Sequence, residues 1–277
     1  MKLSVVMTTP EVLAPVPVAL LNGSFAERLE KAARVGCDGV DLMALRPADL
    51  DGAGIATQVS QYGLEIAAIG TGAVALLDRL TLLSRDPAAG AAAEQRLHEL
   101  IDFAAAAGAP LVTIGGFRGR LANAVWTDAR GARAYLVEVL GSAAERAARA
   151  GVRLVIEPLN RYESDVVNTA AEGLALIHEV GHSHLGLLLD TFHMNIEEPT
   201  YAGSIEQGMA SGRLWHIHLG DSNRLPPGYG HIDFGEIVAA LRHKGYDGYL
   251  SAEHFPQPDP DGAAAATARH MLPILKL

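Results

Sequence analysis

Residues 153–192 of the chain read RLVIEPLNRYESDVVNTAAEGLALIHEVGHSHLGLLLDTF. Two runs rich in Val, Ile and Leu, Arg153–Leu159 and Leu185–Phe192, flank an amphipathic segment, Ala170–Val180. Nearly continuous apolar runs of this length are typical of parallel strands that are covered on both faces. Gly181 follows the amphipathic segment, where a left-handed glycine can end a helix. The stretch therefore predicts a strand, a helix and a second parallel strand.

The same alternation runs along the whole chain of 277 residues. We expect eight strands, at Leu3–Thr8, Gly39–Leu45, Glu65–Thr71, Leu111–Phe117, Arg153–Leu159, Leu185–Phe192, Leu214–Gly220 and Tyr249–Phe255. Eight amphipathic segments predict helices, at Ala26–Val35, Ile55–Tyr62, Pro87–Ala107, Asp128–Ala150, Ala170–Val180, Ile205–Ala210, Phe234–Lys244 and Ala263–Lys276. Six glycines stand where helices should end, at Gly36, Gly63, Gly108, Gly151, Gly181 and Gly245.

Eight strand–helix units without a linker or a change in composition favour one domain, residues 1–277, folded as a (β/α)₈ TIM barrel of the α/β class. The competing fold is an open, doubly wound sheet. That fold normally carries a glycine-rich phosphate loop after an early strand. Gly70-Thr71-Gly72-Ala73 matches this fingerprint poorly, so we expect the closed barrel.

Composition limits the functions that the chain can have. Hydrophobic residues make up 49% of the chain and charged residues 19%, which suits a large core and argues against disorder. A net charge of −10 repels phosphate backbones, so we expect no nucleic-acid partner. The single cysteine, Cys37, has no disulfide partner within the chain. No signal-peptide pattern and no apolar run of ~18–20 residues occurs, so we expect a cytoplasmic protein without a membrane segment.

Each of the last four predicted strands carries a polar side chain near its C-terminal end: Glu157, Asp190, His218 and Glu253. In TIM barrels the chemistry lies at the C-terminal ends of the strands. Taken singly, each residue has a simpler explanation, as a carboxylate that caps a turn or as a buried core histidine. Taken together, three carboxylates at one mouth would repel each other strongly unless a cation neutralised them. The pattern therefore predicts one divalent metal ion held by these four residues.

The types of ligand narrow the choice of metal. Three carboxylates and one imidazole favour Mn²⁺, Mg²⁺ or Co²⁺ over a thiolate-rich zinc site, and we expect Mn²⁺ first. His216 and His218 are two apart on one strand and so share one of its faces. Because His218 is nearer the C-terminal end, we expect it to be the ligand and His216 to lie one layer deeper.

Motifs around these residues resemble the D-tagatose 3-epimerase family of xylose isomerase-like barrels. The resemblance is carried by Glu157-Pro158-Leu159-Asn160-Arg161-Tyr162-Glu163, Asp190-Thr191-Phe192-His193 and His218-Leu219-Gly220-Asp221-Ser222-Asn223-Arg224. It covers essentially the whole chain. Within the family, the segments 68–72, 114–120 and 230–234 look most like those of 5-keto-L-gluconate epimerases.

The resemblance implies an isomerase: a metal-dependent epimerase acting beside the carbonyl of a ketose or keto-sugar acid through a cis-enediolate. It implies substrates of the 5-keto-L-gluconate/D-tagaturonate or the D-tagatose/D-psicose type. It further implies that Glu157 and Glu253 transfer the proton as well as bind the metal. Substrate oxygens would be contacted by Glu163, His193 and Arg224. Barrels of this kind are often dimers or tetramers, so we expect a homo-oligomer.

The residues alone leave alternatives open. Arg118, after the fourth strand, would contact the carboxylate of a sugar acid or form a salt bridge at a rim or subunit interface. An aldose–ketose or hydroxypyruvate isomerase would use the same enediolate. A sugar-acid-binding protein would keep the pocket without turnover. An AP-endonuclease-like enzyme shares the barrel, but it would need more histidine ligands, several metals and a basic rim.

Overall fold

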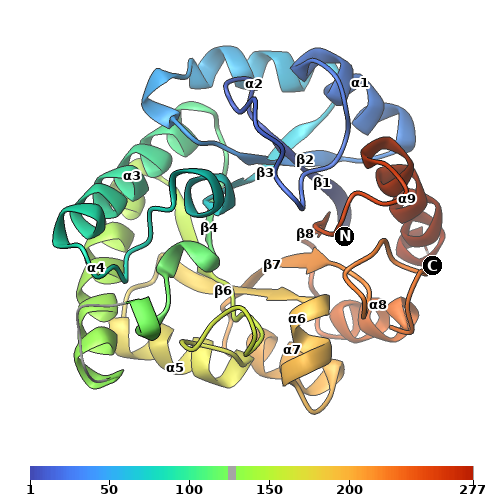
Figure 1. Ribbon diagram of the computed structural model, residues 1–277. Helices are drawn as coiled ribbons and strands as arrows, with labels where there is room; N and C mark the ends of the chain where they lie inside the picture. The colour runs from blue at the N-terminus through green and yellow to red at the C-terminus, as the bar shows by residue number, and fades with distance from the viewer. Residues whose placement is uncertain (124–128, 277) are drawn as a thin grey trace.

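The computed structural model describes residues 1–123 and 129–276, and it shows a closed barrel of eight parallel strands ringed by helices (Figure 1). The strands are β1 (Lys2–Thr8), β2 (Gly39–Met43), β3 (Glu65–Gly70), β4 (Leu111–Ile114), β5 (Arg153–Ile156), β6 (Leu185–Asp190), β7 (Leu214–Leu219) and β8 (Tyr249–Ala252). The helices are α1 (Phe25–Val35), α2 (Gly52–Gln61), α3 (Pro87–Ala106), α4 (Ala129–Ala150), α5 (Ala170–Val180), α6 (Thr191–Glu197), α7 (Tyr201–Ala210), α8 (Phe234–His243) and α9 (Pro260–Lys276). The predicted (β/α)₈ fold is confirmed.

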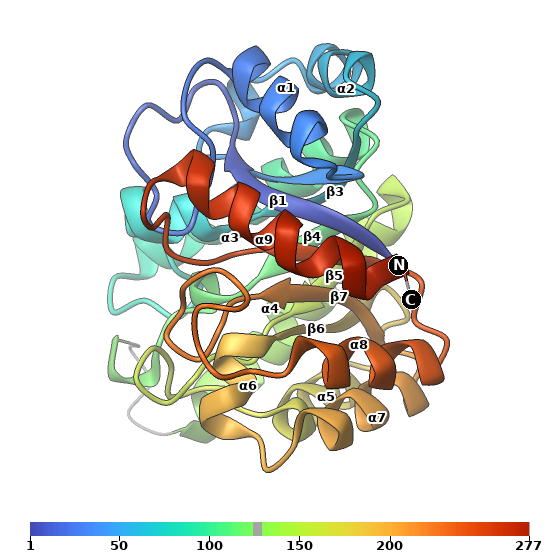
Figure 2. The ribbon, with the colours of Figure 1, turned by 90° about the vertical axis from the view of Figure 1, so that its right-hand side faces the viewer.

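The strands follow one another in chain order around the barrel, and β8 pairs with β1 to close it. Figure 2 shows the barrel from the side, with both chain ends at the right and the long loops after β1 and β7 at the left. Because all the strands are parallel, their C-terminal ends meet at one mouth. Within the described residues, every helix is too short or too polar to cross a membrane. Asp128, the expected start of one helix, lies outside those residues.

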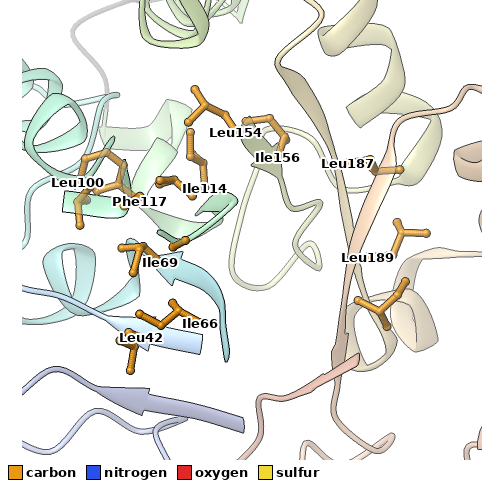
Figure 3. Close-up of a cluster of buried hydrophobic side chains, with 14 of the residues drawn as sticks. Leu42, Ile66, Ile69, Leu100, Ile114, Phe117, Leu154, Ile156, Leu187 and Leu189 are labelled. Carbon is orange, nitrogen blue, oxygen red and sulfur yellow. The ribbon is translucent and has the colours of Figure 1, made fainter. Parts of the chain in front are cut away.

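Side chains of the strands alternate between two layers. Leu154 and Ile156 of β5 belong to the large core between strands and helices (Figure 3). Val155, between them, belongs to a smaller cluster inside the barrel, together with Leu188 of β6. Glu157 continues the inward series of β5. Asp190 continues that of β6 in the same way, so the alternation alone brings these carboxylates to the mouth.

The glycines expected at helix ends adopt the predicted conformation. All six have a positive φ, between 68° and 92°, a region that side chains with a Cβ disfavour (Gly36, Gly63, Gly108, Gly151, Gly181 and Gly245). Each therefore lets the chain leave a helix and turn back toward the next strand.

The sixth strand is shorter than predicted, because it ends at Asp190 and α6 begins at once with Thr191. The Asp190 side chain accepts a hydrogen bond from the backbone N–H of Phe192 at 2.8 Å and so caps the new helix. The expected strand over Leu185–Phe192 was wrong at this end. A helix of seven residues is too short to show a clear apolar period in the sequence.

Arg118 joins the loops that follow β4 and β5. Its side chain has no exposed surface, and its five N–H donors all bond to the protein: to the carbonyl oxygens of Gly115 (3.0 Å), Glu157 (2.6 Å), Val166 (2.9 Å) and Val167 (2.8 Å) and to Ser164 Oγ (3.3 Å). The structure contradicts the expected contact between Arg118 and a substrate carboxylate, because no donor is free to make it. The residue instead fixes the backbone beside Glu157.

Replacing Arg118 should destabilise the barrel without removing any group from the pocket. Arg118→Met keeps most of the side-chain volume but leaves several buried carbonyl groups without a donor, each costing about 1–3 kcal/mol. We expect the thermal midpoint to fall by roughly 10 °C in scanning calorimetry. Arg120→Met, which removes a single exposed hydrogen bond to the Tyr162 carbonyl, is the control and should stay near the wild-type midpoint. An unchanged midpoint for Arg118→Met would contradict this structural role.

Candidate active site

The four predicted metal-binding side chains lie together at the mouth of the barrel. Glu157, Asp190, His218 and Glu253 are all buried, and each places one ligand atom within 4.8 Å of the other three. The strand register explains the meeting, because Asp190 pairs with His218 across β6 and β7. Glu157 and Glu253 stand at the first position beyond β5 and β8. The described part of the chain thus places all four predicted ligands in one cluster.

Negative charge is crowded in this cluster. Burial, followed by repulsion from Glu157 and Glu253, raises the pKa of Asp190 to about 8. Oδ2 of Asp190 has no hydrogen-bond partner among the described residues, whereas Oδ1 is occupied by capping α6. A buried carboxylate oxygen without a partner is costly, and a bound cation would satisfy it. The chemistry of the cluster therefore fits a divalent metal ion.

His218 is the positive element of the cluster. Its Nδ1 lies 3.2 Å from Oε1 of Glu157 and 3.1 Å from Oε2 of Glu253. Burial alone would lower the pKa of His218, but Glu253 and the surrounding carboxylates raise it well above its ordinary value. A proton and a metal ion would therefore compete for the same nitrogen.

A second charged layer lies beneath His218, inside the barrel. Nε2 of His216 lies 2.7 Å from Oδ2 of Asp41, and Ser4 donates a hydrogen bond to Oδ1 of Asp41 at 3.0 Å. Nε2 of His218 lies 3.7 Å from the same carboxylate. Burial would raise the pKa of Asp41, but His216 and His218 lower it, so this carboxylate stays charged. His216 occupies the deeper layer expected of it.

Asp41 was missed in the sequence, although a signal for it exists. It is the one charged residue in Gly39-Val40-Asp41-Leu42-Met43, and it stands at an inward position of that otherwise apolar strand. A carboxylate behind a ligating histidine orients the ring and raises the basicity of its free nitrogen. Asp41 is therefore placed to support His218 as a ligand.

A cavity of about 350 Å³ opens above the cluster. Glu157 and Glu253 line its floor, and the predicted substrate contacts Glu163, His193 and Arg224 line its side. The rest of the lining is largely apolar, with Pro17, Val18, Met43, Ala75, Leu76, Leu159 and Phe255 alongside the glycines and two threonines, Thr71 and Thr113. A mostly apolar pocket with a few convergent polar groups is typical of a small-molecule site.

Arg224 is held tightly at the edge of this cavity. Its Nη1 lies 2.6 Å from Oε1 of Glu163, and its guanidinium carbon lies 4.9 Å from the ring centre of Phe192. Its backbone is in the left-handed region, with φ of 59°. Hydrogen bonds to Asp221 O at 2.7 Å and from Phe255 N at 2.8 Å hold that strained conformation. The side chain is thus directed into the pocket by its own backbone.

Comparison with known proteins shows that this chain is similar to sugar epimerases. The sequence pattern of the family described as xylose isomerase-like TIM barrel matches residues 29–274. The L-ribulose 3-epimerase of Mesorhizobium japonicum is 34% identical over 227 residues, covering 82% of this chain and 74% of the relative. The D-psicose 3-epimerase of Agrobacterium fabrum is 33% identical over 241 residues, covering 84% and 80%.

A solved epimerase structure has the same fold as this chain. The crystal structure of a D-allulose 3-epimerase from Methylomonas sp. superposes with a TM-score of 0.79 at 27% identity, covering 99% of this chain and 98% of the other. The match therefore extends over the whole barrel, including every strand that carries a polar end. On this evidence the chain belongs to the family of xylose isomerase-like TIM barrels.

Proposed function

We propose that the chain is a divalent-metal-dependent epimerase that inverts C3 of a ketose. The observation that carries the proposal is the pair of glutamates on the pocket floor, Glu157 and Glu253, which both contact Nδ1 of His218. Two acid–base groups at one site are what an inversion requires. The L-ribulose and D-psicose 3-epimerases among the relatives support the same activity.

The metal would be held by Glu157, Asp190, His218 and Glu253. Their oxygen-rich donor set, with one unpartnered carboxylate oxygen on Asp190, favours Mn²⁺, and Mg²⁺ and Co²⁺ share that preference. Such an ion supplies Lewis-acid stabilisation of negative charge on substrate oxygens. Without it, the negative charge of the cluster is reduced by protons on Asp190 and His218 and offset by the nearby Arg224.

The two glutamates perform the proton transfer. A hydrogen beside a ketone is only weakly acidic, so a positioned carboxylate must remove it. The resulting enediolate is planar, and inversion requires a proton to arrive on its opposite face. β5 and β8 lie three places apart in the ring of eight strands, so Glu157 and Glu253 reach the pocket from different sides. The apolar wall keeps bulk water away from the reacting carbon.

The charges of the pocket favour a neutral ketose over a keto-sugar acid. Of the described residues that line it, Arg224 alone carries a permanent positive charge, and Glu163 already pairs with it. A substrate carboxylate that approached Arg224 would also meet the negative charge of Glu163, which already offsets the charge of the arginine. Arg118, the other arginine considered for that contact, has every donor committed to the protein. Neutral hydroxyl groups, by contrast, can share the donors of Arg224 and the acceptors of Glu163.

Single Glu→Gln variants should separate the two proton transfers. With metal present, wild-type protein in D₂O should interconvert the C3 epimers of a ketose such as D-psicose and place deuterium at C3. Glu157→Gln and Glu253→Gln should each slow inversion by roughly 10²–10⁴-fold. Each should still exchange deuterium into one epimer, and the two variants into opposite epimers, as NMR would detect.

The matched control is Glu206→Gln, which removes an exposed carboxylate paired with Lys244 on the outer ring. It should keep wild-type turnover. Tagaturonate and 5-keto-L-gluconate, tested in parallel, should turn over poorly, because the negative charge of Glu163 disfavours a substrate carboxylate. Normal inversion by either active-site variant, with metal still bound, would overturn the two-glutamate scheme. Movement of hydrogen between C1 and C2 would instead identify an aldose–ketose isomerase.

Metal affinity should rise with pH. The pKa of Asp190 is raised to about 8, and the pKa of His218 lies well above its ordinary value, so both groups hold protons at neutral pH. A metal must displace those protons, which costs less as the pH increases. Calorimetric titration with Mn²⁺ should show tighter binding from pH 6 to pH 9. It should also show proton release, visible as a dependence of the heat on the buffer. Affinity independent of pH would contradict this linkage.

The carboxylate of Glu157 has room because residue 115 is glycine. A Cβ added at Gly115 would lie 2.2 Å from Oε2 of Glu157, whereas one at Gly116 would meet nothing closer than 4.0 Å. Gly115→Ala should therefore displace the carboxylate and lower turnover by about 10²-fold, the usual cost of a misplacement near 1 Å. Gly116→Ala is the matched control and should retain most activity. Equal turnover in the two variants would show that the carboxylate position is not critical.

A further inference from the structure

The donors around His193 determine which of its ring nitrogens carries a proton. The backbone N–H of Asn160 lies 3.2 Å from Nδ1 of His193, and the side-chain Nδ2 of Asn160 lies 2.8 Å from the same atom. A backbone N–H can only donate a hydrogen bond, so Nδ1 is an acceptor and carries no proton. The neutral ring must then carry its proton on Nε2.

The orientation of the Asn160 amide is fixed by two further partners. Its oxygen accepts a hydrogen bond from the backbone N–H of Tyr162 at 3.0 Å, and its nitrogen donates to Oε1 of Glu163 at 2.9 Å. A flipped amide would point its NH₂ at a donor and its oxygen at a carboxylate, losing both bonds. Two independent donors therefore converge on Nδ1 of His193.

His193 lines the cavity, and its opposite ring nitrogen is buried without a hydrogen-bond partner among the described residues. The side chain is 2% exposed, and its Nε2 makes no hydrogen bond to any residue in the described ranges. Oδ2 of Asp190 lies 3.8 Å away, beyond hydrogen-bond distance. Because Nδ1 accepts hydrogen bonds from both donors of Asn160, it carries no proton and the ring is neutral. A buried N–H left free beside a pocket is costly unless a ligand accepts its hydrogen bond.

We propose that Asn160 is a positioning residue that holds His193 as a fixed Nε2–H donor for the substrate oxygen that becomes negative during the reaction. The proposal rests on the proposed epimerase activity. When a glutamate takes the proton from the carbon, the electron pair of the broken C–H bond moves toward the carbonyl oxygen. His193 donates a hydrogen bond to that oxygen and keeps its own proton. A donor oriented in advance stabilises such charge without reorganisation.

Asn160 also links this donor to the rest of the pocket. The amide that bonds to His193 bonds to Glu163, and Glu163 in turn pairs with Arg224. The side chain of Asn160, which is 1% exposed, thus orients two predicted substrate contacts, His193 and Glu163. No contact with a candidate metal ligand is needed for this role, which separates Asn160 from the metal centre.

The first test reads the tautomer directly. In protein labelled with ¹⁵N-histidine and loaded with diamagnetic Mg²⁺, long-range ¹H–¹⁵N NMR distinguishes protonated from unprotonated ring nitrogens. His193→Gln assigns the signal among the 11 histidines. The wild-type ring should be neutral with its proton on Nε2. A proton on Nδ1, or a charged ring at pH 7, would overturn the proposal, and this result needs no turnover.

The second test reverses the chemistry of residue 160. Asn160→Asp keeps the shape but replaces the shorter side-chain donor with a charged acceptor, and leaves only the backbone N–H of residue 160 at 3.2 Å. The carboxylate should outweigh that remaining donor, so Nδ1 should gain a proton and the neutral Nε2–H tautomer should be lost. Asn168→Asp makes the same change in the same loop. Because the Asn168 side chain bonds to carbonyl groups of Leu159 and Ser164, that variant should leave the His193 tautomer unchanged.

Kinetics then connect the tautomer with catalysis. Asn160→Asp should lower kcat by roughly 10²–10³-fold, the cost of removing one oxyanion donor, and KM and the affinity for Mn²⁺ should change much less. Near-normal kcat together with an altered tautomer would overturn the positioning role. A wild-type protein with the expected tautomer but no epimerase activity would count against the proposed function alone. Should Asn160→Asp fail to fold, the proposal is tested by the tautomer of His193 in the wild-type protein. Asn160→Ser, which retains a small donor, then provides the second variant.

Discussion

Repulsion among three buried carboxylates governs the mouth of this barrel. Glu157, Asp190 and Glu253 each place one carboxylate oxygen within 4.8 Å of the others. Their charges must therefore be balanced locally. His218 supplies that balance when it is protonated, and the proposed metal does so when it binds. Asp41 then supports the histidine from below. Negative and positive groups thus alternate along the barrel axis, and each layer depends on the next.

The polar wall of the pocket follows a second constraint, the direction of its donors. Arg224 is oriented by a strained backbone and by two aromatic rings, and His193 is oriented by the backbone and side-chain amides of one residue, Asn160. Neither side chain depends on the metal ligands for its orientation. Charge balance at the floor and donor direction at the wall are therefore set by separate residues. A substitution at the wall can therefore change the direction of a donor while the metal ligands stay in place.

The sequence predicted those parts of the molecule that depend on regular periods. Alternation along strands placed Glu157, Asp190, His218 and Glu253 at one mouth, and a glycine after a helix reliably marked its end. Features that depend on the backbone of distant segments were not predictable. The partners of Arg118 are mostly carbonyl groups, which leave no side-chain pattern, and so its role was misjudged. The helix α6 was not predicted, because Asp190, which caps it, had been interpreted as a metal ligand alone.

The hydrogen bonds of Arg118 bear on how relatives of this barrel can diverge. Four of its five bonds go to main-chain carbonyl groups, which every amino acid provides. Substitutions in the loops that it joins can therefore change the shape and polarity of the pocket without releasing this anchor. An enzyme built in this way can acquire new sugar preferences through loop mutations while the distance between the two proposed acid–base groups stays the same.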